Sequence, residues 1–166
     1  MILSNRGIQK ALDEGRLVIT PEPQPREPIV GGPPCPYDTS AVDLRLGRYI
    51  SVPRKDQPFT FDLRRGNLAR FLADHCDLVD LTRPGGFTLD QNSFILAQTL
   101  EEVALPLFPD QPPLAARIEG KSSRARVGLL VHFTAPTVHA GWDGPLTLEM
   151  INLGPASITL WYVQPI

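Results

Sequence analysis

The chain has 166 residues, enough for one domain with a buried core, and its 42% apolar and 20% charged residues are ordinary for a globular protein. A net charge of −2 gives no general attraction to nucleic acid or to an anionic membrane surface, so a bound anion needs a local cluster of cations. No apolar run approaches the roughly 18 residues that span a bilayer, and the N-terminus lacks the pattern of a signal peptide. We therefore expect neither nucleic acid nor a membrane as a partner.

The N-terminal part is predicted to contain one helix, one short strand and a long loop. Ser4 is a suitable N-cap for a helix over residues 5–14, and the apolar residues 17–19 predict a strand. Proline is frequent in residues 21–36, which predicts an extended surface loop rather than a domain linker, because so short a preceding segment cannot form a domain.

The rest of the chain is dominated by predicted strands. Residues 66–80 carry apolar side chains at helical spacing and predict a short helix, and residues 127–133 suit either a strand or a short buried helix. Alternating or apolar segments bounded by turn residues predict strands at 41–47, 49–52, 59–63, 87–89, 93–106, 146–152 and 158–163. Many short strands with frequent turns indicate a single mainly β domain, a barrel or a sandwich, over residues 1–166.

The segment 119–128 concentrates groups that bind anions. After a glycine it places two adjacent hydroxyls among three cations: Lys121, Ser122, Ser123, Arg124 and Arg126. Hydroxyls, backbone N–H groups and cations that converge in this way suit a phosphate. A solvated polar turn in front of a strand is the alternative on charge alone.

Glu149 is a carboxylate in the middle of a predicted apolar strand. Alternation puts Leu146, Leu148 and Met150 on one face of that strand and Glu149 on the other. The pattern leaves two interpretations open. The carboxylate either faces solvent or lines a cleft whose walls change its pKa for proton transfer.

Several common types of site are absent from the sequence. It has no Walker loop, no GxGxxG after a strand, no GxSxG and no HExxH, and the zinc nucleobase-deaminase signature is missing. His75, His132 and His139 are scattered, so each is expected to be a surface or core residue rather than a metal ligand. The two cysteines, Cys35 and Cys76, have no paired spacing; a disulfide stays open, but a reduced cytoplasmic protein is favoured.

Five blocks of sequence, in this order, resemble the dCTP deaminases, the zinc-independent branch of the trimeric dUTPase-like superfamily. Residues 40–47 are similar to the family's SVDLRLG segment, residues 120–129 to GRSSxARxGL, and residues 141–152 to GWxG followed by TLExxN. The N-terminal segments 3–8 and 15–21, and residues 94–106 with their FLAxTxE…LP pattern, match as well. The resemblance covers nearly the whole chain.

The resemblance implies a distorted β-barrel or jelly roll with a short N-terminal helix, assembled as a homotrimer with active sites between subunits. It implies deamination of dCTP to dUTP and ammonia, in the supply of dUMP and dTTP, in the cytoplasm. By position the catalytic residues are Glu149, Arg126 and Ser123, with Glu149 as the base that activates water. The nucleotide and phosphate ligands are Lys121, Ser122, Ser123, Arg126, His139 and Trp142. Mg²⁺ is expected with the triphosphate of dCTP, dUTP or dTTP, with no zinc and no protein-bound catalytic metal.

Three departures from the family pattern affect what the resemblance implies. Lys121 stands where arginine is usual, so a point charge replaces a bidentate contact with phosphate. His139 stands where aspartate is usual, and this exchange argues against hydrolysis of the triphosphate. The family's C-terminal arm lies beyond Ile166 and is expected to be missing. The alternatives are therefore a dUTP diphosphatase or bifunctional enzyme, and a trimer that binds nucleotide without turnover.

Overall fold

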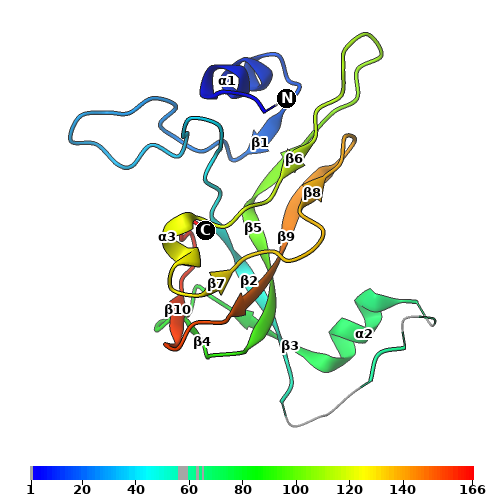
Figure 1. The fold of residues 1–166 in the computed structure, drawn as a ribbon. Coiled ribbons are helices and arrows are strands. Elements are labelled where there is room, and N and C mark those ends of the chain that lie inside the picture. Colours follow the sequence, from blue (N-terminus) through cyan, green and yellow to red (C-terminus); the bar gives the residue numbers. More distant parts are fainter. Residues whose placement is uncertain (1, 56–59, 63, 65) are drawn as a thin grey trace.

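Two long antiparallel strands, β5 (Phe94–Ala104) and β9 (Asp143–Asn152), run through the centre of the molecule (Figure 1). The structure is a computed structural model and describes residues 2–55, 60–62, 64 and 66–166. A six-stranded sheet has the order β3-β2-β5-β9-β7, and β1 also pairs with β5. The other four strands of this sheet are β1 (Val18–Thr20), β2 (Leu46–Pro53), β3 (Cys76–Asp80) and β7 (Leu129–Leu130).

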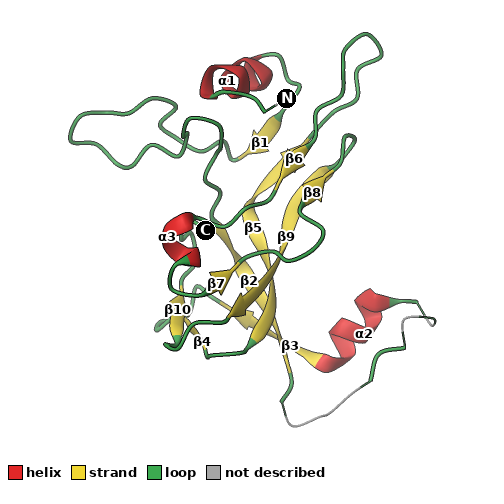
Figure 2. Ribbon diagram, viewed as in Figure 1, coloured by secondary structure: helices red, strands yellow, loops and turns green. Residues whose placement is uncertain are grey.

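Two small sheets and three helices complete the described part. β4 (Phe87–Leu89) pairs with β10 (Ile158–Leu160), and β6 (Ala116–Arg117) pairs with β8 (Thr137–Val138). The helices α1 (Asn5–Asp13), α2 (Leu68–His75) and α3 (Ser122–Ala125) lie outside the central strands (Figure 2). This arrangement confirms the predicted mainly β class with a short N-terminal helix.

Alternation along the two central strands builds the main core. Ile95, Ala97, Leu148 and Met150 are at most 2% exposed, and they pack with Leu46, Ile50, Leu81, Leu89, Leu129, Val131, Leu160 and Ile166. A second cluster lies nearer β6 and β8 and contains Val103, Leu105, Val138 and Leu146. Burial of these apolar side chains is the main favourable term that holds the strands together.

Several predicted elements agree with the structure. Ser4 caps α1 by accepting a hydrogen bond from the backbone N–H of Gly7, and the helix ends one residue earlier than predicted. The strands predicted at 17–19, 87–89, 93–106 and 146–152 are present as β1, β4, β5 and β9, within three residues at each end. The strand predicted at 158–163 ends at Leu160, and 127–133 contains only the two-residue strand β7.

The strand predicted over 41–47 is wrong for most of its length, because β2 begins only at Leu46. The buried side chain of Glu101 is the physical reason. Its carboxylate accepts from the backbone N–H of Arg45 at 2.8 Å and pairs with the Arg45 guanidinium at 2.6 Å. Residues before β2 therefore bond to a side chain and to loop carbonyls, such as that of Pro36, instead of a neighbouring strand.

The helix predicted over 66–80 ends at His75, because the following residues pair with β2 as strand β3. The strand predicted over 59–63 falls partly on residues 59 and 63, outside the described part, and residues 60–62 are not in a strand. Residues 21–36 contain neither helix nor strand. None of the described helices combines the length and apolar character that a membrane crossing requires.

Candidate functional site

The predicted anion-binding segment folds as a single helical turn, α3, between β6 and β7. The side chains of Ser122, Ser123 and Arg126 are exposed. Lys121 precedes the turn, and its backbone carbonyl accepts from the N–H groups of Arg124 and Ala125 at 2.8 and 3.0 Å. Hydroxyls and one cation are thus presented to solvent on a short, folded segment.

Lys121 does not present a free charge. Its ammonium group forms an ion pair with the carboxylate of Asp43, and both side chains are about one-third exposed. The family-like segment 40–47 and α3 are therefore joined directly. A partly buried pair of this kind fixes the position of the lysine side chain and offsets part of its charge.

A close crossing of two loops holds α3 against the end of β9. Gly128 has φ +92°, and a Cβ at this position would come within 2.2 Å of the backbone nitrogen of Gly154. The carbonyl of Gly128 accepts from the N–H of Leu153 at 2.8 Å. Only glycine permits both the positive φ and this approach.

Asn152 fixes the other side of that crossing. Its side chain is fully buried, donates to the carbonyls of Leu89 and Ala156 at 3.0 and 2.8 Å, and accepts from the N–H of Gly154 at 2.9 Å. The glycine and the asparagine of the family-like blocks thus act on backbone geometry. They position α3 against the end of β9.

His139 and Trp142 lie in the turn between β8 and β9. The turn closes through a bond from the Trp142 N–H to the His139 carbonyl at 3.2 Å, and the indole Nε1–H donates to the Gly144 carbonyl at 3.1 Å. The His139 side chain is exposed and Trp142 is 42% exposed. An imidazole and an indole are therefore presented to solvent at this end of β9.

Glu149 lies on the outward face of β9, as its sequence pattern indicated. Leu148 and Met150 on either side are 2% and 0% exposed, whereas the Glu149 side chain is 32% exposed. Its direct partner on β5 is Leu96. The carboxylate is thus half-buried on a partly apolar surface and is still reachable by a ligand.

The groups nearest the Glu149 carboxylate come from the segment after β7. Oε2 accepts from the backbone N–H of Phe133 at 3.4 Å, and the Phe133 ring stacks on Phe94 with centroids 5.9 Å apart. His132 Nδ1 lies 3.7 Å from the same oxygen. The antiparallel pairs Leu129–Asn152 and Leu130–Ile151 direct the chain that follows β7 along β9 towards Glu149.

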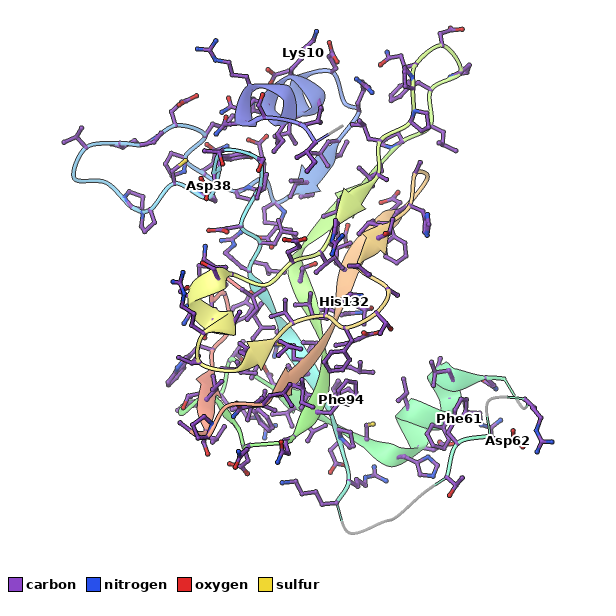
Figure 3. All side chains as sticks on the ribbon, in the orientation of Figure 1. Lys10, Asp38, Phe61, Asp62, Phe94 and His132 are labelled. Atoms are coloured by element: carbon purple, nitrogen blue, oxygen red, sulfur yellow. The ribbon has the colours of Figure 1, made fainter. Side chains whose placement is uncertain are left out.

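His132 is the residue that the sequence did not identify as part of this site. Its side chain is 8% exposed, and neither ring nitrogen has a hydrogen-bond partner within the described residues. Figure 3 labels it beside the central strands, between the α1 end and the α2 end of the molecule. The only sequence signal was a single polar residue in an otherwise apolar run.

Within one protomer the three groups make no direct polar contact with one another among the described residues. Among the residues that the structure describes, no hydrogen bond or ion pair joins α3 to Glu149, or joins either of them to the His139–Trp142 turn. The described residues also contain no group of three or more His, Cys, Asp or Glu side chains placed to hold a metal ion. The chemistry available is that of a carboxylate, two hydroxyls, cations and an imidazole.

Comparisons with known proteins agree on one family. The sequence model of the family described as dCTP deaminase-like matches residues 2–162. The chain is 38% identical over 163 residues to "dCTP deaminase, dUMP-forming" of Corynebacterium glutamicum (strain R), covering 97% of this chain and 75% of that protein. It is 37% identical over 166 residues to "dCTP deaminase" of Pectobacterium atrosepticum, covering 96% and 77%.

A solved structure shows the same fold. The crystal structure of 2'-deoxycytidine 5'-triphosphate deaminase from Agrobacterium tumefaciens matches with a TM-score of 0.64 at 22% identity. The match covers 99% of this chain and 45% of that chain, so the chain spans less than half the length of that protein. It spans about three quarters of the length of the two curated relatives.

Proposed function

The chain belongs to the dCTP deaminase-like family, and from this premise we propose that it is an enzyme that hydrolyses the amino group of dCTP to give dUTP and ammonia. The observation that carries the proposal is Glu149, a half-buried and reachable carboxylate in the middle of β9, at the position of the family's catalytic glutamate. General acid–base catalysis needs such a group beside the substrate.

The proposed reaction adds water to C4 of cytosine and expels ammonia. Glu149 accepts a proton as the water oxygen bonds to C4 and passes this proton to N3, so that the bond between C4 and N3 becomes single. Glu149 then takes the proton of the new C4 hydroxyl and delivers it to the amine, the bond between C4 and the amine breaks, and ammonia leaves as the C4 carbonyl forms. Ser123 and Arg126 supply fixed donors that hold the water and stabilise the charge that develops.

The α3 segment is proposed to hold the phosphates. Ser122 and Ser123 are exposed hydroxyls, and Arg126 is an exposed guanidinium that suits bidentate contacts with phosphate oxygens. Lys121 adds a point charge whose position Asp43 fixes. Mg²⁺ enters as part of the Mg–triphosphate substrate, and His139 and Trp142 contact the nucleotide from the β8–β9 turn.

We also propose a homotrimer of distorted β-barrel or jelly-roll protomers with active sites between subunits. In the described residues of one protomer, α3, Glu149 and the His139–Trp142 turn make no direct polar contact with one another, which supports this, because a second copy can complete each site. The outward sheet surface carries apolar side chains that a partner would cover, including Tyr49, Leu78 and Phe133 at 44%, 72% and 41% exposure. Two free cysteines, Cys35 and Cys76, fit a cytoplasmic location.

A second product is possible in this family. Several relatives, at up to 38% identity, are named as dUMP-forming, which favours an enzyme that also removes pyrophosphate. The presence of His139 in place of the usual aspartate argues against the removal of pyrophosphate, because a carboxylate is the better base for the water that attacks the α-phosphate. We place dUTP first for this reason.

Product analysis tests the proposal. The protein is incubated with dCTP and Mg²⁺, and ammonia, dUTP, dUMP and pyrophosphate are quantified over time. Ammonia with equimolar dUTP is the expected result. Equimolar dUMP and pyrophosphate would instead establish the second function, and tight dCTP binding without any product would leave only a nucleotide-binding trimer.

A further inference from the structure

The imidazole of His132 is buried and has no hydrogen-bond partner in the part of the chain that the structure describes. It is 8% exposed, and both ring nitrogens lack a hydrogen-bond partner among the described residues, which is uncommon for a buried polar group. A side chain that served only to fill the core could be apolar at lower cost, because buried nitrogens without partners lose their hydration. The buried ring therefore indicates that His132 has a role other than stabilising the fold of the free protomer.

The Glu149 carboxylate is a charged group that lies beside this ring. Nδ1 and Oε2 are 3.7 Å apart, slightly beyond hydrogen-bond distance, and Oε2 also accepts a long hydrogen bond of 3.4 Å from the Phe133 N–H. Hydrogen bonds to catalytic groups are often long before substrate binds and shorten in the complex. A shift of less than 1 Å would place the imidazole in contact with the carboxylate.

We propose that His132 is a positioning residue, whose Nδ1–H donates to Oε2 of Glu149 in the substrate complex and so directs Oε1 towards the water and the cytosine. The inference rests on the proposed function and names a further residue of the same site. A carboxylate that turns freely spends less time in the reactive orientation, and small misplacements of catalytic groups cost large factors in rate.

Three substitutions of His132 distinguish the effect of losing its hydrogen bond to Glu149 from the effect of changed packing. Asparagine carries its amide nitrogen near the position of Nδ1, glutamine carries it near Nε2, and leucine carries no donor. We expect His132→Asn to keep kcat within about fivefold of the wild type. We expect His132→Leu and His132→Gln to lower kcat by about 10- to 100-fold, with the KM for dCTP changed by less than about threefold.

Stability provides the second measurement. Because the histidine nitrogens have no partners to lose, His132→Leu should have a Tm equal to or above that of the wild type. His75 on α2 is the matched control, since its Nδ1 already contacts the Phe71 carbonyl at 2.8 Å. Helix α2 leads into β3, and β2 and β5 lie between β3 and the strand β9 that carries Glu149 (Figure 1). His75→Leu should leave kcat unchanged.

The outcomes distinguish this inference from the proposed function. Wild-type protein without deaminase turnover would overturn both. An active wild type with a His132→Leu variant within twofold of it would overturn the inference alone. A His132→Leu variant that loses both Tm and activity, with no recovery in His132→Asn, would also overturn it and assign the histidine a structural role.

Discussion

Lys121 and Asp43 form an ion pair across 78 positions of sequence, and this pair joins α3 to the segment in front of β2. Each side chain is about one-third exposed, so the pair is neither fully solvated nor fully buried. The ion pair thereby holds the lysine side chain in place next to the exposed serines Ser122 and Ser123. Its three N–H donors can serve Asp43 and a phosphate together, but without the planar, two-point geometry of a guanidinium.

Lys121→Arg should therefore strengthen the binding of the triphosphate. A guanidinium can keep the contact with Asp43 and add a bidentate contact to phosphate, so we expect the KM for dCTP to fall by about 2- to 10-fold at unchanged kcat. Steady-state kinetics of Lys121→Arg, with Lys10→Arg on exposed α1 as control, checks this. An unchanged or higher KM would show that Lys121 serves Asp43 and not the phosphates.

Glu149→Gln should abolish deamination and leave the fold intact. The amide keeps the shape of the side chain but cannot accept the proton from water, and loss of a general base costs about 10²- to 10⁴-fold in rate. Ammonia release by this variant is compared with that of Glu102→Gln, which changes an exposed glutamate on β5. Turnover near that of the wild type would remove Glu149 from the mechanism.

Ser122→Ala and Arg126→Ala should lower kcat/KM far more than stability. Both side chains are exposed and neither makes a hydrogen bond to another described residue through its side chain. We expect a loss of about 10- to 100-fold in kcat/KM, and a Tm within about 2 °C of the wild type. Arg117→Ala is the control, since its exposed pair with Glu119 lies outside α3. Unfolding of either variant would assign these residues a structural role.

The sequence identified the central strands because their patterns are local. Alternation in β5 and β9 indicates which side chains are buried. It correctly placed Glu149 on the face of β9 that does not carry Leu148 and Met150. The failures involve long-range contacts. Residues 41–45 alternate as a strand should, yet the Glu101 carboxylate takes the N–H of Arg45, and no local pattern reveals a partner 56 positions away.

The site was predictable only in part for the same reason. Residues 120–129 and 147–152 could be selected by their family-like motifs, whereas the pairing of Lys121 with Asp43 depends on the folded chain. The same holds for His132. A lone histidine among apolar residues has no sequence property that distinguishes a core residue from one placed 3.7 Å from a carboxylate.

Gly128→Ala should destabilise the protein and displace α3. The substitution combines a positive φ with a Cβ only 2.2 Å from the backbone of Gly154, so the two loops must separate. We expect a loss of more than about 3 kcal/mol of unfolding free energy. Gly15→Ala is the matched control, because Gly15 also has a positive φ but open space around it, and should cost about 1–2 kcal/mol. Urea denaturation of both variants measures the difference, and equal losses would contradict the clash.

The buried phenol of Tyr37 should make the free energy of unfolding depend on pH in the alkaline range. Its ring is 4% exposed beneath the proline-rich segment 21–36, and its hydroxyl donates to Glu22 Oε1 at 3.4 Å. Burial, with the negative charge of Glu22, raises the pKa of Tyr37 to about 12. The folded state therefore favours the neutral phenol more strongly than the unfolded chain does, in which the pKa is about 10.

The pKa of Tyr37 is higher in the folded than in the unfolded state. Its contribution to the free energy of unfolding is therefore complete below about pH 10 and is lost as the pH rises from about 10 towards 12. The slope of this loss approaches roughly 1.4 kcal/mol per pH unit. Urea denaturation between pH 8 and pH 11.5 should show a steeper fall for the wild type than for Tyr37→Phe, which has no phenol to ionise. Parallel curves for Tyr37→Phe and the wild type would mean that the buried phenol ionises equally in both states.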